Sequence, residues 1–200
     1  MLEALFVEMR ALGALDVVIT ATALVYVWLA ARENPWCWAW GGVSCALWAY
    51  VSLTRYDLWL DALLQVYYVG MSVYGLLHWR IGTTGNEEPA APIVEWRWPR
   101  HLGLLVLGVP LSLLFGYGFA TYTPAAATYL DAFTTVFALL TTYLVVRKVR
   151  SNWLYWIVID LALAYLYASR GAYLFTGLMF VYVGIAAWGY WRWRPVLRRV

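Results

Sequence analysis

Seven long apolar stretches fill most of this chain, at residues 12–31, 36–54, 57–79, 101–121, 125–146, 152–169 and 171–191. Each has about the ~17–25 residues that an α-helix needs to cross a ~30 Å hydrocarbon core. Hydrophobic residues make up 64% and charged residues 12% of the 200 positions, against roughly 45–50% and 25% in soluble domains. The sequence therefore predicts an all-α, multi-pass membrane protein with seven transmembrane helices.

The positions of the 14 basic residues predict how these helices are oriented. Basic residues near short loops favour the cytoplasmic side of a membrane. If the N-terminus lies outside, all basic residues except Arg10, Arg55 and Arg170 fall in the inner loops or the C-terminal tail. We therefore expect an N-out, C-in topology. The net charge of +3 is interpreted as a topology signal, and a nucleic-acid partner is not expected.

The second half of the chain repeats the first half in the same direction. Five positions match at a separation of 114: Tyr68, Val69, Gly70, Tyr74 and Gly75 correspond to Tyr182, Val183, Gly184, Trp188 and Gly189. Two further strings match at separations of 115 and 116, and they pair Asp16 with Asp131 and Ser44 with Asp160. Internal repeats in a membrane protein are typical of transporters whose binding site lies where the halves meet.

A single helix, at residues 101–121, separates the two triplets of helices, and this odd number keeps both copies in one orientation. We expect a 3+1+3 arrangement of parallel repeats, related by an axis along the membrane normal. Residues 1–80 form the predicted first triplet, and residues 81–124 form a cytoplasmic connector with the linker helix. Residues 125–200 form the second triplet with a basic tail.

Pro110 lies in the middle of the predicted linker helix. A proline there favours a kink, because it lacks an N–H group and its ring clashes with the preceding turn. The kink would act either as a hinge for rocking or as a static bend. The static bend is favoured, because prolines are commoner in membrane helices than in soluble ones.

Polar side chains at the middle of a membrane helix usually have a function, because inserting a charge there costs ~2.5–3.5 kcal/mol on insertion scales. Ser44, Gln65 and Asp160 each lie about eight residues into their predicted helices, which is ~12 Å at 1.5 Å per residue. That depth is close to the middle of a ~30 Å core. The three side chains are therefore predicted to meet at one level.

Aromatic residues gather around that level. Trp153, Trp156 and Asp160 are spaced i, i+3, i+7 and share one face of a helix. Trp40 makes a looser ladder with Ser44, and Tyr68 and Tyr182 add rings with polar tips. Tryptophan walls and a carboxylate floor suit a flat, cationic heterocycle, through stacking, cation–π attraction and charge pairing.

Three other aspartates each have more than one possible role. Asp16 and Asp131 occupy equivalent repeat positions nearer the outer face, where a structural role, capping or bonding a neighbouring helix, competes with gating. Asp61 precedes Gln65 by one turn, and it either gates the outer entrance or pairs with Arg55. Proton coupling through Asp16, Asp131 and Asp160 is a further alternative.

Other functional classes lack the residues that they need. A retinal protein requires a lysine inside its last helix, and the only lysine, Lys148, lies in a loop. His78 and His101 both lie at cytoplasmic helix ends, so no haem or metal site is expected in the bundle. Neither a phosphate-binding Gly-rich loop nor a nucleophile elbow appears, so we expect no enzyme activity and no cofactor.

The chain resembles the Pnu-type vitamin transporters, whose best-known members are the bacterial nicotinamide riboside transporters. Four strings, which cover most of the chain outside the connector and the linker helix, carry the resemblance: Trp38 through Tyr50, Asp61 through Gly75, Asp131 through Arg147, and Asn152 through Asp160. The last string resembles the family motif Asn-Trp-x-x-Trp-x-x-x-Asn. Asp160 departs from it where the riboside transporters usually have Asn, and Ser44 stands where an Asn is common.

The resemblance implies a fold related to the sugar-transporting SWEET proteins, in the bacterial inner membrane. It also implies facilitated diffusion of a vitamin that a cytoplasmic kinase then phosphorylates and traps. Carried over by position, Gln65, Trp153 and Trp156 would contact the substrate, and Asn152 opens the same motif. A homo-oligomer such as a trimer is left open.

Physical chemistry ranks the substrates that the resemblance allows. An ionised Asp160 favours a fixed cation, which both nicotinamide riboside and thiamine supply, whereas riboflavin is neutral. The order is therefore nicotinamide riboside, then thiamine, then riboflavin. A vitamin sensor that does not transport is the remaining alternative.

Overall fold

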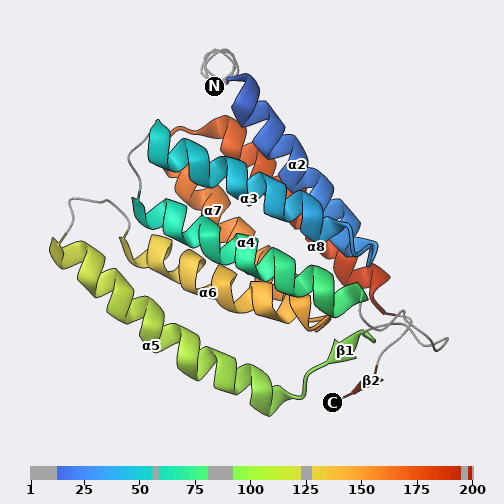
Figure 1. Cartoon of the computed structure of the whole chain (residues 1–200). Coiled ribbons are helices and arrows are strands. Elements are labelled where there is room, and N and C mark those ends of the chain that lie inside the picture. Colours follow the sequence, from blue (N-terminus) through green and yellow to red (C-terminus); the bar gives the residue numbers. More distant parts are fainter. Residues whose placement is uncertain (1–12, 56–58, 81–91, 123–127, 195–197, 200) are drawn as a thin grey trace. The chain divides into compact units, whose positions relative to one another are not determined.

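The computed structural model describes residues 13–55, 59–80, 92–122, 128–194 and 198–199 (Figure 1). Seven helices lie in these residues: α2 (Ala14–Ala31), α3 (Cys37–Thr54), α4 (Trp59–Arg80), α5 (Trp98–Tyr122), α6 (Thr128–Val146), α7 (Asn152–Ser169) and α8 (Tyr173–Arg192). Each coincides with one of the seven predicted helices to within a few residues, so the all-α prediction is confirmed.

Four of these helices are long and apolar enough to cross a membrane on length and composition: α2, α5, α6 from Tyr129, and α8. The other three helices are α3, α4 and α7. They carry every predicted substrate residue except Tyr182. Large apolar side chains such as Leu63, Val106 and Leu114 are exposed, as expected for helices whose outer faces contact lipid.

The described chain divides into two compact units, which we call the N-terminal unit (residues 6–92) and the C-terminal unit (residues 93–200). In the N-terminal unit, α3 packs against both α2 and α4. In the C-terminal unit, α6 packs against α5 and α7, and α7 packs against α8. The linker helix α5 therefore belongs to the same unit as the second triplet.

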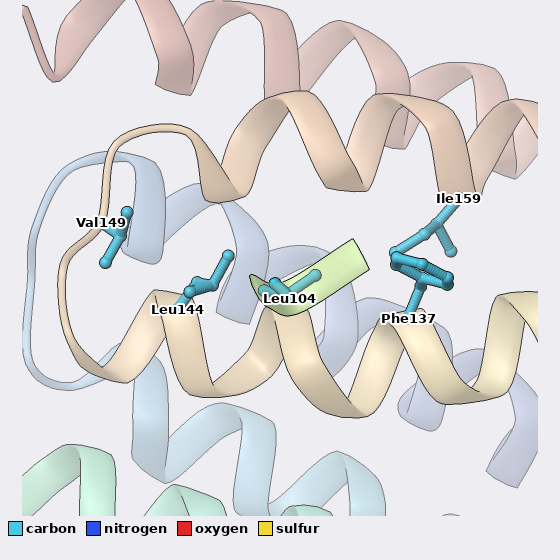
Figure 2. Close-up of a cluster of buried hydrophobic side chains, with 5 residues drawn as sticks. All are labelled: Leu104, Phe137, Leu144, Val149 and Ile159. Atoms are coloured by element: carbon cyan, nitrogen blue, oxygen red, sulfur yellow. The ribbon is translucent and has the colours of Figure 1, made fainter. Parts of the chain in front are cut away.

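A cluster of buried apolar side chains explains why α5 joins the second triplet. Leu104 comes from α5, Phe137 and Leu144 from α6, Val149 from the turn after α6, and Ile159 from α7 (Figure 2). Leu144 and Val149 are fully buried, and Ile159 is almost so. Burying a Leu, Val or Ile side chain is worth ~1.5–3 kcal/mol in water, although lipid tails reduce this gain and leave close packing as the main benefit.

The turns between the first two helices of each triplet have the same backbone conformation. Glu33 and Lys148 lie 115 positions apart, and both have a positive φ, of 59° and 49°. The two turns close with equivalent hydrogen bonds, from Asn34 N to Leu29 O at 3.0 Å and from Val149 N to Leu144 O at 2.9 Å. This is the pattern of a Schellman cap. The internal repeat therefore extends to the geometry of the backbone.

A tryptophan of the second helix packs on a glycine of the third helix in each triplet. The Trp38 indole covers Gly75 in the N-terminal unit, and the Trp153 indole covers Gly189 in the C-terminal unit. Each tryptophan also meets a second one edge to face: Trp38 and Trp79 at 5.5 Å and 87° between ring planes, Trp153 and Trp193 at 5.3 Å and 83°. Edge-to-face contact is a favourable arrangement of aromatic rings. Sequence periodicity did not predict these contacts.

Part of the predicted connector is ordered and paired. Strand β1 (Val94–Glu95) pairs in parallel with β2 (Arg198–Arg199), and the Val94 backbone exchanges hydrogen bonds with Lys148 O and Arg150 N. Residues 81–91 of the connector lie outside the described residues. Helix α5 begins at Trp98, slightly earlier than predicted, and it continues without interruption through Pro110. Whether that proline is a hinge or a static bend stays a prediction.

Candidate functional site

The predicted substrate residues divide between the two units, and each unit is described by itself. Ser44, Trp40, Gln65 and Tyr68 lie on α3 and α4 of the N-terminal unit. The remaining ones lie on α7 and α8 of the C-terminal unit: Asn152, Trp153, Trp156, Asp160 and Tyr182.

Asp160 is a buried carboxylate in the middle of α7, with 5% of its surface exposed. The hydroxyl of Tyr182, from the neighbouring helix α8, lies close enough to interact with it electrostatically. Trp156 lies one turn before Asp160 on the same helix, partly buried against the cluster around Phe137. Asp160 therefore lies near the phenol of Tyr182, and the indole of Trp156 lies one turn away on the same helix. Their contact with a substrate stays a prediction.

Ser44 has a different environment from the one that the sequence suggested. It is 6% exposed, and its Oγ donates a hydrogen bond to Ile19 O of α2 at 3.0 Å. The bond ties α3 to α2. Because a hydroxyl has one proton to donate, Ser44 can offer a substrate only its acceptor lone pair.

The repeat alignment of Ser44 with Asp160 is wrong by one residue. Helix α3 begins at Cys37 and α7 begins 115 positions later at Asn152, and both helices have 18 residues. At this separation Asp160 corresponds to Cys45. The packing agrees, because Trp38 and Trp153, which also lie 115 positions apart, cover equivalent glycines of α4 and α8. One position thus holds a thiol in the N-terminal unit and a carboxylate in the C-terminal unit.

The remaining candidates of the N-terminal unit differ in exposure. Trp40 is 44% exposed on α3, and Gln65 is partly buried on α4. Tyr68 meets Tyr67 edge to face, with ring centroids 5.5 Å apart. Their roles as substrate contacts stay predictions.

Trp153 and Asn152 are packed into the start of α7. Trp153 is 2% exposed between Gly189 and Trp193, and Asn152 is fully buried with its Nδ2 donating to Val149 O at 2.7 Å. Within the described residues, the Trp153 Nε1 and the Asn152 Oδ1 have no hydrogen-bond partner. Because they are buried and pack within the unit, both side chains contribute to its stability, and their contact with substrate stays a prediction.

Asp16 and Asp131 form equivalent ion pairs at the predicted outer end of each triplet. Asp16 lies 3.9 Å from Arg55, which follows α3, and Asp131 lies 3.1 Å from Arg170, which follows α7. The Asp16 carboxylate also accepts a hydrogen bond from Gly13 N at 2.9 Å, just before α2. These are the capping and helix-bridging contacts that a structural role requires.

Asp61 does not make the pairing with Arg55 that the sequence offered as one alternative. Its carboxylate accepts a hydrogen bond from the hydroxyl of Ser52, on the neighbouring helix α3. Ser52 is fully buried. The interaction holds the start of α4 against the end of α3, and the gating alternative stays a prediction.

The Asp131–Arg170 pair is expected to contribute little stability, because its two side chains are 39% and 45% exposed. Exposed ion pairs are typically worth under ~1 kcal/mol. Replacing Asp131 with Asn should therefore lower the thermal unfolding midpoint of the detergent-purified protein only slightly. The matched variant Asp16→Asn, whose carboxylate is 19% exposed and also caps α2, should lower it more. The reverse order would contradict this assignment.

The chain is similar to known membrane transporters. Residues 13–195 match the sequence model of the family described as Nicotinamide mononucleotide transporter. The nicotinamide riboside transporter PnuC of Escherichia coli (strain K12) is 24% identical over an alignment of 189 positions, which covers 81% of this chain and 77% of that protein. The protein of the same name from Shigella flexneri gives the same values.

A solved structure has the same fold. The crystal structure of the Vitamin B3 transporter PnuC aligns with a TM-score of 0.68 at 24% identity, covering 90% of this chain and 80% of that one. The family match spans all seven helices of the described residues, from Gly13 before α2 to beyond the end of α8. The chain therefore belongs to the nicotinamide mononucleotide transporter family.

Proposed function

We propose that this chain carries nicotinamide riboside across the bacterial inner membrane by facilitated diffusion, and that a cytoplasmic kinase traps the vitamin by phosphorylation. The observation that supports the substrate best is the buried carboxylate of Asp160 beside Tyr182. A carboxylate inside a membrane protein is costly unless it meets a partner. The pyridinium ring of nicotinamide riboside supplies a permanent positive charge and a flat face.

The proposed roles follow from the side chains. Asp160 pairs with the pyridinium charge, and Trp156, one turn away, stacks on the ring. Gln65 hydrogen-bonds the polar groups of the substrate. Both curated relatives bear the name nicotinamide riboside transporter, which supports the same substrate.

The charge distribution disfavours the phosphorylated form of the vitamin, although the family description refers to a mononucleotide. In the part of the chain that the structure describes, every Lys and Arg lies in a turn, in β2, next to a helix or in the first or last turn of one. Phosphate is usually recognised by Arg, Lys or a helix N-terminus. A mononucleotide would therefore bring its phosphate near Asp160 without a basic residue at that depth.

Thiamine is the second candidate, because its thiazolium ring is also a fixed cation and because the riboside transporters usually have Asn where this chain has Asp160. A titration of the purified full-length chain against nicotinamide riboside, nicotinamide mononucleotide, thiamine and riboflavin, read by tryptophan quenching, distinguishes these substrates. We expect the riboside to bind most tightly and the mononucleotide at least ~10-fold more weakly, which corresponds to ~1.4 kcal/mol.

The variant Asp160→Asn is the matched control for that titration. It should retain part of the riboside binding and lose most of the preference for riboside over mononucleotide. Tightest binding of thiamine would replace the proposed substrate but keep the site. Binding without uptake into liposomes would identify a sensor, and uptake that falls when a protonophore is added would identify a proton-coupled carrier.

A further inference from the structure

Exposed arginines gather at the predicted cytoplasmic end of the C-terminal unit. Arg97 and Arg100 lie at the start of α5, Arg147 follows α6, and Arg192 and Arg194 lie at the end of α8. All five side chains are exposed, and no ion pair joins any of them to a carboxylate in the described residues. We call these five residues the arginine rim.

Hydrogen bonds bring the three parts of the rim together. The Val94 backbone bonds to Lys148 O and Arg150 N, which places the segment before Arg97 beside the turn that follows α6. The Arg150 Nε donates to Tyr190 O at 3.0 Å, which joins the same turn to the end of α8. The rim is therefore one surface and not three separate helix ends.

The carboxylate nearest to the rim in the described residues is already engaged. Glu95 lies 3.7 Å from the guanidinium of Arg150, whose side chain is only 10% exposed and which also lies over the ring of Tyr190. The other acidic residues of the unit, Asp131 and Asp160, lie near the opposite end and in the middle of their helices. The charge of the rim is therefore left for a partner outside the described chain.

The N-terminal unit has no such surface, although it repeats the same fold. Its described residues at the predicted cytoplasmic end include two exposed arginines, Arg32 and Arg80, and each lies over a tryptophan ring, at 3.7 Å and 4.4 Å. Of the five rim arginines, Arg192 alone has such a contact in the described residues, with Trp188 at 5.5 Å. The overall excess of basic residues sets the orientation of a membrane protein, and it does not require them to gather on one triplet. The concentration on one unit therefore calls for a second explanation.

We propose that the arginine rim binds the headgroups of anionic phospholipids. Clusters of basic residues at the cytoplasmic end of membrane helices attract anionic lipids, and guanidinium groups bind phosphate oxygens in pairs. The exposed indoles of Trp98 and Trp191, at 69% and 61% exposure, flank the rim on α5 and α8. Exposed indoles at helix ends suit the headgroup level of a bilayer. An open rim at that level fits lipids better than a soluble anion, which an enclosed site would hold.

The test measures the unfolding temperature of the full-length protein in neutral maltoside micelles as phosphatidylglycerol or phosphatidylcholine is added. Phosphatidylglycerol should raise the unfolding temperature and phosphatidylcholine should not, because a ligand that binds only the folded state stabilises it. Free glycerol phosphate at the same concentration should have no effect. Salt at about 0.5 M should weaken the lipid effect by screening.

Paired variants locate the effect. The double variants R97Q/R100Q and R192Q/R194Q should each shift the phosphatidylglycerol midpoint upward, on the order of tenfold. The control R32Q/R80Q removes the same charge from the same side of the membrane and should leave the midpoint unchanged. If one rim variant fails to fold, the other carries the test.

Three outcomes would overturn the proposal. Equal stabilisation of the wild type by both lipids would show that the rim is not selective for anionic lipid. An equal shift in R32Q/R80Q would show a general charge effect. The connector residues Glu87 and Glu88 lie outside the described residues, and a lipid effect that emerges only in E87Q/E88Q would show that this connector occupies the rim.

Discussion

Replacing Gly75 with alanine is expected to destabilise the protein by several kcal/mol, and Gly189→Ala is expected to have a similar effect. An added Cβ at Gly75 would lie closer than 3.0 Å to the six-membered ring of Trp38, and one at Gly189 would lie 2.7 Å from the Trp153 ring. Both indoles are 2% exposed and also meet Trp79 and Trp193 edge to face. Overpacking of this kind costs ~1–3 kcal/mol, and more where the neighbours cannot move.

The same helices provide matched controls. Gly70 on α4 and Gly184 on α8 lie 114 positions apart, and a Cβ at either would have no neighbour within 4 Å. Alanine at these positions should leave the unfolding temperature unchanged or raise it, because Ala is favoured over Gly in a helix by up to ~1 kcal/mol.

Thermal unfolding in detergent, with size-exclusion profiles, measures all four variants. Gly75→Ala combined with Trp38→Leu should recover part of the lost stability, since the smaller side chain relieves the overlap. An unfolding temperature of Gly75→Ala equal to that of the wild type would show that Trp38 does not fill the space above Gly75.

Replacing Trp156 with alanine is expected to lower uptake of nicotinamide riboside by about 10- to 100-fold, while the protein remains folded. The proposed function assigns this indole to stacking on the pyridinium ring, one turn from Asp160. A desolvated cation–π contact contributes ~2 kcal/mol or more, and each ~1.4 kcal/mol changes a rate or affinity tenfold. Uptake into liposomes, normalised to the amount of folded protein, measures the effect.

Two companion variants separate substrate contact from packing. Trp156 also packs against the Phe137 cluster, so Trp156→Phe should keep that packing and recover part of the uptake. Trp191 on α8 is 61% exposed, and Trp191→Ala should transport at nearly the normal rate. Normal uptake by Trp156→Ala would mean that the substrate site lies elsewhere.

The sequence predicted the helices well because the cost of burying backbone polar groups in lipid leaves long apolar helices as the main solution. It also predicted the face of α7 that holds Trp156 and Asp160, since helical periodicity is regular over so short a distance. Periodicity cannot name the partner of a side chain on another helix. Trp153 shares that face, yet it packs on Gly189.

The sequence contains a signal for the tryptophan–glycine contacts, which a comparison of single residues does not use. Trp38 and Trp153 lie 115 positions apart, and Gly75 and Gly189 lie 114 apart, so the contacting pairs recur together. Ser44 matches Asp160 only when polar residues are compared by type, without a fixed start for either helix. The start of α3 at Cys37 and of α7 at Asn152 removes that freedom. The pairing of β1 with β2 had no such signal, because it depends on distant, very short segments.

The two ends of each triplet are held by interactions of unequal strength. At one end, buried indoles pack on glycines. At the other end, an ion pair lies partly in solvent, and in the first triplet the Ser52–Asp61 hydrogen bond lies there as well. Each triplet is therefore expected to be rigid at the end with the tryptophan–glycine contacts and more flexible at the end with the ion pair. Thermal fluctuations would then separate the helices of a triplet at the outer end more easily than at the inner end. This flexibility would allow each half to open toward the outside and admit a vitamin.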